Sequence, residues 1–343
     1  MIILPLPFWV PCVLPKISSK CAFATLALVA SCVPLACKRN APPGSEQARD
    51  AQSVGTHSLG TPARPALAPP MLPAQEITWD YPNTELGRMR VVVLVPEREA
   101  DARLPVLVAL HGRGEALKGV ELGARGWVDD YTLPRTIERL HRPPLTLDDL
   151  RGFADEARLA RLNASLVERP YQGLIVVCPY TPDTLPADES IDKALPLARF
   201  VVETVLPRVS RETPALGTPE STGIDGVSLG GRAALGIGLL RPKAFAVVAS
   251  LQAALRSDNS ADILRRAREA KVQKPQLFVR LLTSSDDYFL KANQLLATDL
   301  ATAGIRTELV TIPGPHDYDF NRGPGGYEML MFHDRVLRGQ PEF

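Results

Sequence analysis

The sequence has almost no net charge and few cysteines outside its first residues. Its 39 Lys and Arg balance 38 Asp and Glu and leave a formal charge of +1, which supplies no overall field for holding nucleic acid. Four of the five cysteines are Cys12, Cys21, Cys32 and Cys37, and no C-x-x-C pair occurs. Nucleic acid is therefore excluded as the main partner, and neither a disulfide framework nor a zinc site is expected. The fifth cysteine, Cys178, lies in an apolar run and is expected in the core.

The beginning of the chain is predicted to direct the protein to its destination. The 17 residues between Lys20 and Lys38 carry no charge and are mostly apolar, which is the anatomy of a signal peptide. Residues 29–32 read Val-Ala-Ser-Cys and resemble the bacterial lipobox, whose cysteine is acylated. We expect a lipoprotein-type signal peptide over residues 1–31, a lipid anchor at Cys32, and export to the periplasm or the outer membrane. A spanning helix, which needs about 20 apolar residues, is the alternative.

A tether and then a folded domain are expected after this anchor. Residues 32–75 are rich in Pro and Ala and show no helical or alternating apolar period, so they are predicted to form a flexible tether. Residues 76–343 contain short apolar runs separated by amphipathic stretches. Residues 115–170 interrupt this alternation over a length unusual for a connection. They form either a lid or wall of a substrate pocket or a decoration on the outside.

The alternation in residues 76–343 predicts an α/β fold with a mainly parallel central sheet and helices on both faces. Strands are expected at residues 90–96, 104–110, 174–179, 245–251, 276–282 and 307–312. Helices are expected at residues 191–209, 231–240, 261–270, 290–303 and 326–337. Several of the strands are continuously apolar, as strands covered on both faces are.

The motif Gly226-Val227-Ser228-Leu229-Gly230 matches G-x-S-x-G. In a tight turn from strand to helix, small residues two before and two after the serine let the backbones pass closely while the hydroxyl projects above the sheet. The helix that follows directs its first N–H groups at the site and favours developing negative charge. Ser228 is therefore the candidate nucleophile. The expected strand before it, residues 223–225, is short and hardly apolar.

A second motif, His111-Gly112-Arg113-Gly114, directly follows an expected strand, at the sheet edge where ligands gather in such folds. Its backbone can direct an N–H group at an oxyanion. We expect the N–H groups of Leu229 and Arg113 to form the oxyanion hole. His111 is interpreted as structural, with a role as catalytic base as the competing idea.

A candidate base and a candidate acid follow the serine along the chain. His316 lies in a loop after the last expected strand, near the carboxyl end, from which it can reach Ser228. Asp286 and Asp287 follow the strand at residues 276–282. An acidic residue at a strand end often caps the next helix, so one of the two is expected to cap while the other orients the imidazole.

Together these residues resemble the α/β-hydrolase superfamily, in particular its esterase D and enterochelin-esterase-like branch, from about Glu76 to Arg338. The resemblance includes an early β hairpin, and Asp287-Tyr288-Phe289-Leu290 fits the context of the acid in that branch. Thr283 departs from the glycine usual just before the acid. The resemblance implies a triad of Ser228, Asp287 and His316, a small acyl ester as substrate, and hydrolysis through an acyl-enzyme.

This chemistry needs no metal or organic cofactor. Two other functions remain open on the sequence. One is a non-catalytic, hydrolase-like lipoprotein that binds a ligand in the cell envelope. The other is a peptidase or acyltransferase, because acyl transfer to an amine, an alcohol or water starts from the same acyl-enzyme, and fold does not determine function.

Overall fold

The computed structural model describes residues 75–99, 101–185 and 189–340. The expected signal peptide, the anchor at Cys32 and all of the expected tether except Gln75 lie outside the described residues. None of the helices in the described part of the chain is both long and apolar enough to cross a membrane.

A single eight-stranded sheet organises the described residues, with the strand order β1-β2-β4-β3-β5-β6-β7-β8. The first two pairings, β1 with β2 and β2 with β4, are antiparallel, and all others are parallel. The strands are β1 (Gln75–Thr84), β2 (Gly87–Val95), β3 (Val106–Leu110), β4 (Ile175–Pro179), β5 (Thr222–Gly226), β6 (Val247–Leu251), β7 (Phe278–Ser284) and β8 (Arg306–Ile312). The expected mainly parallel sheet is confirmed.

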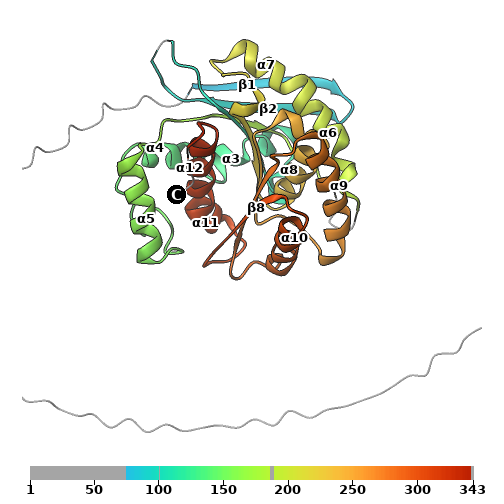
Figure 1. Ribbon diagram of the computed structural model, residues 1–343. Helices are drawn as coiled ribbons and strands as arrows, with labels where there is room; N and C mark the ends of the chain where they lie inside the picture. Colours follow the sequence, from blue (N-terminus) through green and yellow to red (C-terminus); the bar gives the residue numbers. More distant parts are fainter. Residues whose placement is uncertain (1–74, 100, 186–188, 341–343) are drawn as a thin grey trace, which may run out of the picture. The chain divides into compact units, whose positions relative to one another are not determined.

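Helices cover both faces of this sheet (Figure 1). The α-helices are α1 (Arg113–Ala116), α2 (Gly119–Gly123), α3 (Gly126–Asp129), α4 (Leu133–Leu140), α5 (Glu156–Glu168), α6 (Leu195–Arg199), α7 (Leu206–Glu212), α8 (Leu229–Leu240), α9 (Ser260–Gln273), α10 (Leu290–Thr302), α11 (Tyr318–Phe320) and α12 (Gly326–Val336). The other helical turns are η1 (Ile191–Ala194), η2 (Phe200–Val205), η3 (Pro219–Ser221), η4 (Pro242–Ala244), η5 (Ser257–Asn259) and η6 (Asn321–Gly325).

The strands divide their side chains between two hydrophobic cores. In β2, Val91 and Val93 pack into one core with α8, α9 and α10, and Val92 and Leu94 pack into the other with α4, α5 and α12. Successive strand residues point to opposite faces, so a strand that is apolar throughout is buried on both. The buried Cys178 in β4 belongs to the second core.

Each expected strand is present, with ends that differ by at most three residues. The early hairpin that the resemblance implied is formed by β1 and β2. The helix predicted over residues 191–209 is present and extends to Glu212, but its hydrogen-bond pattern changes along its length, so that it divides into η1, α6, η2 and α7, which follow one another without a gap. Pro196 and Pro207 lie within it, and each removes one N–H donor from the regular α-helical pattern.

The short and hardly apolar strand expected before the serine motif is β5, which is fully buried at the centre of the sheet. Its polar residue Asp225 accepts a hydrogen bond from Nε2 of His333 on α12 at 3.2 Å, and both side chains are buried. A Cβ on Gly223 would approach Nδ1 of His333 to 2.5 Å, so only glycine leaves room for this ring. The low apolarity of β5 is therefore explained by a partner on the last helix, and His333 is packed in the core.

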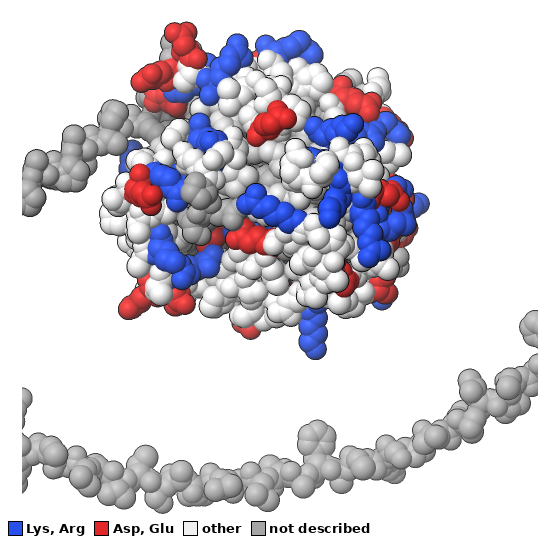
Figure 2. All heavy atoms as spheres, viewed as in Figure 1, with Lys and Arg blue, Asp and Glu red and all other residues white. Residues whose placement is uncertain are grey.

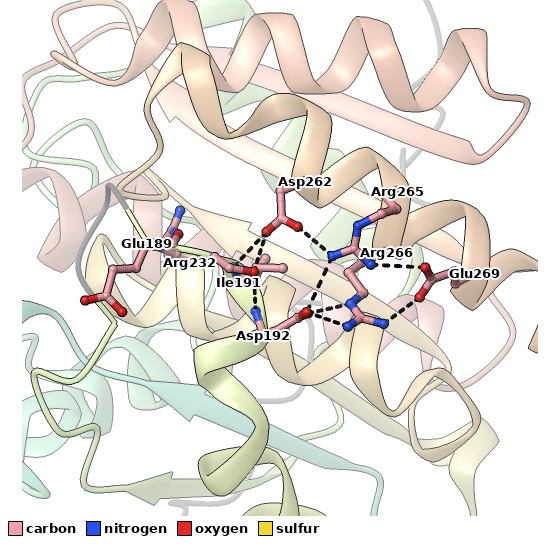
Figure 3. Close-up of polar contacts among 9 residues, drawn as sticks. Glu189, Ile191, Asp192, Arg232, Asp262, Arg265, Arg266 and Glu269 are labelled. Atoms are coloured by element: carbon pink, nitrogen blue, oxygen red, sulfur yellow. Dashed lines mark hydrogen bonds and ion pairs between the residues drawn. The ribbon is translucent and has the colours of Figure 1, made fainter. Parts of the chain in front are cut away.

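Arginine-rich helix α9 is joined to η1 by a polar network (Figure 3). Asp262 accepts hydrogen bonds from the Ile191 N–H at 2.9 Å and from Arg265 at 2.6 Å, and Arg266 binds Asp192. These groups are partly exposed, and each such ion pair contributes little to stability by itself.

On the face seen in Figure 2, charges of both signs are interspersed, in keeping with the near-zero net charge.

Candidate active site

Ser228 occupies the turn between β5 and α8 and has an unusual backbone conformation. Its φ is 57° and its ψ is −116°, a region that costs a non-glycine residue of order 1–3 kcal/mol and persists where the surroundings impose it. Those surroundings are backbone hydrogen bonds: the Ser228 N–H donates to Leu251 at 2.9 Å, and its carbonyl accepts from Ala254 at 2.9 Å. The predicted strained turn is thus present and is held by the strand next to it.

The two glycines of the motif are required by close backbone approach. A Cβ on Gly226 would lie 2.4 Å from the carbonyl oxygen of Gly230, and a Cβ on Gly230 would lie 2.3 Å from the carbonyl oxygen of Leu110. No real Cβ atom packs so closely against backbone, so any side chain at either position would force strand β3 and the turn apart. The close approach of the backbones that the motif predicts is therefore present in the structure.

Asp287 and His316 are hydrogen-bonded to each other. Asp287 Oδ1 lies 2.9 Å from His316 Nδ1, and the side chains of both are largely buried. The same oxygen accepts from the Phe289 N–H at 2.9 Å, and Oδ2 accepts from the Thr283 hydroxyl at 2.8 Å. A carboxylate that accepts three hydrogen bonds is fixed in orientation, so it can hold the imidazole in one tautomer. Thr283, which departs from the family pattern, thus supports the Asp287 carboxylate.

Asp286 does not have the capping role expected for it. Its side chain is exposed, and the residue at the N-cap of α10 is Phe289, with no side-chain cap. The prediction that the second aspartate caps this helix is therefore wrong. In the turn before α10, it is the side chain of Asp287 that accepts a hydrogen bond from the Phe289 N–H.

Aromatic residues next to Asp287 cover the His316 imidazole. The Tyr288 ring is stacked on the His316 ring at a centroid distance of 4.6 Å, and Phe289 meets the same ring edge-on at 5.5 Å. Tyr288 is otherwise 73% exposed, so it closes the solvent side of the imidazole. These contacts limit the orientations that the ring can adopt.

Gln252, directly after β6, fixes the loop that carries His316. Its φ is 47°, and its side chain is buried. The amide Nε2 donates to the Ser284 hydroxyl at 2.6 Å and to the Pro315 carbonyl at 2.8 Å. Ser284 donates to the same carbonyl at 3.0 Å. Gln252 therefore ties the ends of β6 and β7 to the residue before His316.

His111 uses both ring nitrogens for structure. Its Nε2 accepts from the Thr181 N–H at 2.8 Å, so Nδ1 carries the hydrogen and donates to the Gly112 carbonyl at 2.9 Å. Burial lowers the pKa of His111 to about 4. The ring is therefore neutral and fully engaged, in agreement with the structural interpretation.

This arrangement also orients the first peptide of α1. The C=O and N–H groups of one trans peptide point in opposite directions, so a Gly112 carbonyl held by His111 directs the Arg113 N–H away from that ring. Arg113 and Leu229 are the first residues of α1 and α8, where N–H groups have no partner within the helix. Both expected donors thus lie at helix N-termini.

A cavity of about 240 Å³ opens at this edge of the sheet. It is lined by Gly112, Arg113, Gly114, Glu115, Tyr131, Val227, Ser228, Tyr288, His316, Asp317, Tyr318 and Asn321. The candidate nucleophile and base therefore face one space, and Asp287 stands behind the base. Among the described residues, no three His, Cys, Asp or Glu side chains gather so as to hold a metal ion.

The long insertion both lines the cavity and packs outside it. Glu115 and Tyr131, from its first part, line the cavity. Its later part, α4 and α5, packs beside α12 (Figure 1), where Arg158 binds the buried Glu328. Each of the two open interpretations thus describes one part of the segment.

The chain is similar in fold to solved structures of esterases and other hydrolases. The sequence matches no model of a known protein family, and no curated protein is significantly similar to it. The chain is similar in structure to a ferulic acid esterase, with a TM-score of 0.57 and 17% identity over 77% of this chain and 98% of the other. The chain has the α/β-hydrolase fold.

Two further similarities fall in the branch that the sequence resembles. An S-formylglutathione hydrolase from Staphylococcus aureus has a TM-score of 0.54 and 15% identity over 76% of this chain and 99% of the other. The enterobactin esterase from Shigella flexneri has a TM-score of 0.52 and 18% identity over 80% of this chain and 61% of the other. The α/β-hydrolase fold expected from the motifs is therefore confirmed.

Proposed function

We propose that this chain is a serine hydrolase that cleaves carboxylic esters through an acyl-enzyme. The observation that carries the proposal is the strained Ser228, which faces one cavity with an imidazole bound to a buried carboxylate. Strain at a functional turn and a hydrogen-bonded His–Asp pair beside it are the parts that nucleophilic catalysis requires. The esterase activities of structurally similar proteins are in keeping with this chemistry.

In the proposed reaction, Ser228 Oγ attacks the ester carbonyl carbon while His316 takes its proton. The Nδ1 hydrogen of His316 is donated to Asp287, which leaves Nε2 as the base and stabilises the imidazolium that forms. The tetrahedral intermediate collapses when the C–O bond to the alcohol breaks and His316 protonates the leaving oxygen. Water then attacks the acyl-enzyme by the same route and releases the acid and free Ser228.

The developing oxyanion would be bound by the N–H groups of Arg113 and Leu229. Leu229 is the first residue of α8, whose 12 residues favour negative charge at this end. Arg113 begins the single turn α1, where its N–H has no partner within the helix. His111 would contribute indirectly, because it holds the Gly112 carbonyl and so sets the direction of the Arg113 N–H.

A fluorophosphonate probe and a panel of short acyl esters test this proposal. We expect the probe to label Ser228, as shown by peptide mass spectrometry, and the wild-type domain to hydrolyse the esters. Ser228→Ala should lose both, since removal of a triad nucleophile typically costs about 10⁶ in kcat. Ester turnover that survives in Ser228→Ala would reject the assignment. Ligand binding by a domain that neither reacts with the probe nor hydrolyses esters would favour the non-catalytic alternative.

We also propose that the protein is an exported lipoprotein anchored through Cys32. Support comes from the apolar stretch and the lipobox-like residues 29–32. One acyl chain gives only marginal membrane attachment, and stable anchoring takes more than one. Mass spectrometry of the membrane-extracted protein should find an acylated amino-terminal cysteine, and an unprocessed amino terminus in a soluble fraction would contradict this.

A further inference from the structure

Glu115 is a buried carboxylate on which two tyrosines converge beside the candidate nucleophile. The Tyr318 hydroxyl donates to Oε1 at 2.6 Å, and the Tyr131 hydroxyl donates to Oε2. Glu115 is only 1% exposed, and it is separated from Tyr318 by 203 residues along the chain. All three residues line the cavity that contains Ser228. None of the three takes part in the proposed bond-breaking steps.

The two glycines of the His-Gly-Arg-Gly motif make room for these hydroxyls. A Cβ on Gly112 would lie 3.0 Å from the Tyr131 hydroxyl and 3.7 Å from Ser228 Cβ, and a Cβ on Gly114 would lie 2.8 Å from the Tyr318 hydroxyl. The hypothetical Gly112 Cβ is also 3.2 Å from Oε2 of Glu115. The carboxylate and its tyrosines are therefore immediate neighbours of the reaction centre.

The hydrogen bonds fix which groups this wall offers to a substrate. A carboxylate only accepts hydrogen bonds, and a tyrosine has a single hydroxyl hydrogen. Both hydrogens are used on Glu115, so the phenol oxygens act towards other groups as acceptors. The Tyr131 oxygen accepts from the Gly112 N–H at 3.2 Å. Tyr318 is 38% exposed and lines the cavity, so its oxygen presents an acceptor there, and no hydroxyl hydrogen of this cluster is left to bind an anion.

The charges around the cavity favour the same kind of group. Besides Glu115, its lining includes Asp317 and one cation, Arg113, which is largely exposed and pairs with Asp183 at 2.8 Å. The Lys118 ammonium is 3.9 Å from Glu115 but closer, at 2.6 Å, to Asp130. The Arg322 guanidinium lies 5.4 Å from the centre of the Tyr318 ring and is engaged by Asp319 and by the Asp130 carbonyl. At an effective dielectric constant of about 20, two like charges about 6 Å apart disfavour binding about 100-fold. A substrate carboxylate placed beside Glu115 would meet this penalty.

We propose that Glu115, with Tyr131 and Tyr318, makes the cavity selective for esters that carry a hydrogen-bond donor, a hydroxyl or ammonium group, near the scissile bond, and that it rejects carboxylates there. The inference rests on the proposed ester hydrolysis and specifies its substrate class. Glu115 is a specificity-determining residue, and the bond-breaking steps remain with the triad.

Two ester series measured in a pH-stat test the proposal. The first compares butyl, 4-hydroxybutyl and 3-carboxypropyl acetate, which differ in the alcohol. The second compares the methyl esters of pentanoic acid and 5-hydroxypentanoic acid with the monomethyl ester of glutaric acid, which differ in the acyl part. In at least one series we expect kcat/KM for the carboxylate to fall about 100-fold below that for the neutral ester, with the hydroxyl compound as the best substrate. The series that discriminates identifies the part bound beside Glu115.

Variants separate charge from hydrogen bonding. Glu115→Gln should relax the discrimination against the carboxylate at least about tenfold, whereas Tyr318→Phe should lose the preference for the hydroxyl and keep the rejection of the carboxylate. Glu121→Gln is the matched control, because it removes an exposed carboxylate of the same segment that pairs with Arg88, and it should change neither ratio. Melting temperatures are compared first. If Glu115→Gln does not fold, Tyr318→Phe tests the proposal, and an unchanged preference for the hydroxyl compound in that variant would overturn it.

The outcomes distinguish this proposal from the proposed function. Hydrolysis of the neutral esters without discrimination in either series would overturn the role of Glu115 and leave the hydrolase proposal standing. Discrimination that survives unchanged in Glu115→Gln would also overturn it. Failure to hydrolyse every ester, together with failure to react with a fluorophosphonate, would contradict the hydrolase proposal itself.

Discussion

The role of Asp287 leads to a quantitative prediction for its replacement by asparagine. Oδ1 of Asp287 accepts from both His316 Nδ1 and the Phe289 N–H, and Oδ2 accepts from Thr283. In Asp287→Asn, the amide oxygen must take the Oδ1 position, because an NH₂ group there would face the Phe289 N–H. The amide nitrogen can then donate to the Thr283 hydroxyl, which can also act as an acceptor. The tautomer of His316 is therefore retained, and only the negative charge is lost.

The size of the effect follows from that charge. An imidazolium and a carboxylate about 4 Å apart interact by about 4 kcal/mol at an effective dielectric constant of about 20. Since 1.36 kcal/mol corresponds to a tenfold change in rate, kcat should fall about 10³-fold. Loss of the correct tautomer as well would lower it by about 10⁴. The structure thus predicts the smaller of these two effects.

Steady-state kinetics with a short acyl ester, together with melting temperatures, provide the assay. Asp286→Asn is the matched control, because it changes the adjacent, exposed carboxylate, and it should alter kcat by less than about twofold. A fall of less than tenfold in Asp287→Asn would refute the proposed role of its charge. A fall above 10⁴ would show that the Phe289 N–H does not fix the amide, and a larger loss in the control would transfer the role to Asp286.

Three further predictions concern the supports of the site. Thr283→Val should lower the free energy of unfolding by about 1–3 kcal/mol, because it removes a hydrogen bond to a buried carboxylate, with a smaller loss of kcat than in Asp287→Asn; urea titration and kinetics check both. Gln252→Leu should lower kcat more than it changes KM, since the loop before His316 loses its tie, and an unchanged kcat would contradict this. His111 has a folded pKa of about 4 against 6.5 in the unfolded chain, so its stabilisation is complete above pH 6.5 and is lost as the pH falls towards 4. His111→Gln should therefore weaken the stability loss between pH 7 and pH 5 by about 2 kcal/mol in urea unfolding, and equal losses in both proteins would disprove it.

The features predicted from the sequence are those that local sterics and apolar patterns determine. The Gly226 and Gly230 positions could be recognised because a close turn excludes side chains there, and the continuously apolar β4 because it is covered on both faces. The apolar pattern does not reveal strand β1, because most of the residues of this strand are exposed. Only the resemblance to a family suggested the hairpin.

Residues whose role depends on a distant partner could not be found in this way. Gln252 carries no motif, and its importance arises from the Pro315 carbonyl, 63 residues further along. Glu115 follows directly on the His-Gly-Arg-Gly motif, and an acidic residue beside an expected oxyanion loop was the one available signal. Its partners Tyr131 and Tyr318 could be joined to it only by the fold.

The bond between Asp225 and His333 has a consequence for the order in which the molecule is made. The strand that leads to Ser228 buries a carboxylate whose partner lies on the last helix, 108 residues later in the chain. A buried acceptor that loses its hydrogen-bond donor destabilises the fold by about 1–3 kcal/mol. While the ribosome has yet to release α12, the buried Asp225 carboxyl on the central strand lacks this donor and keeps only the Gly226 N–H, and the turn after it lacks its final support. Truncated products that stop before His333 should therefore be inactive, and the centre around Ser228 is completed only when synthesis of the chain is finished.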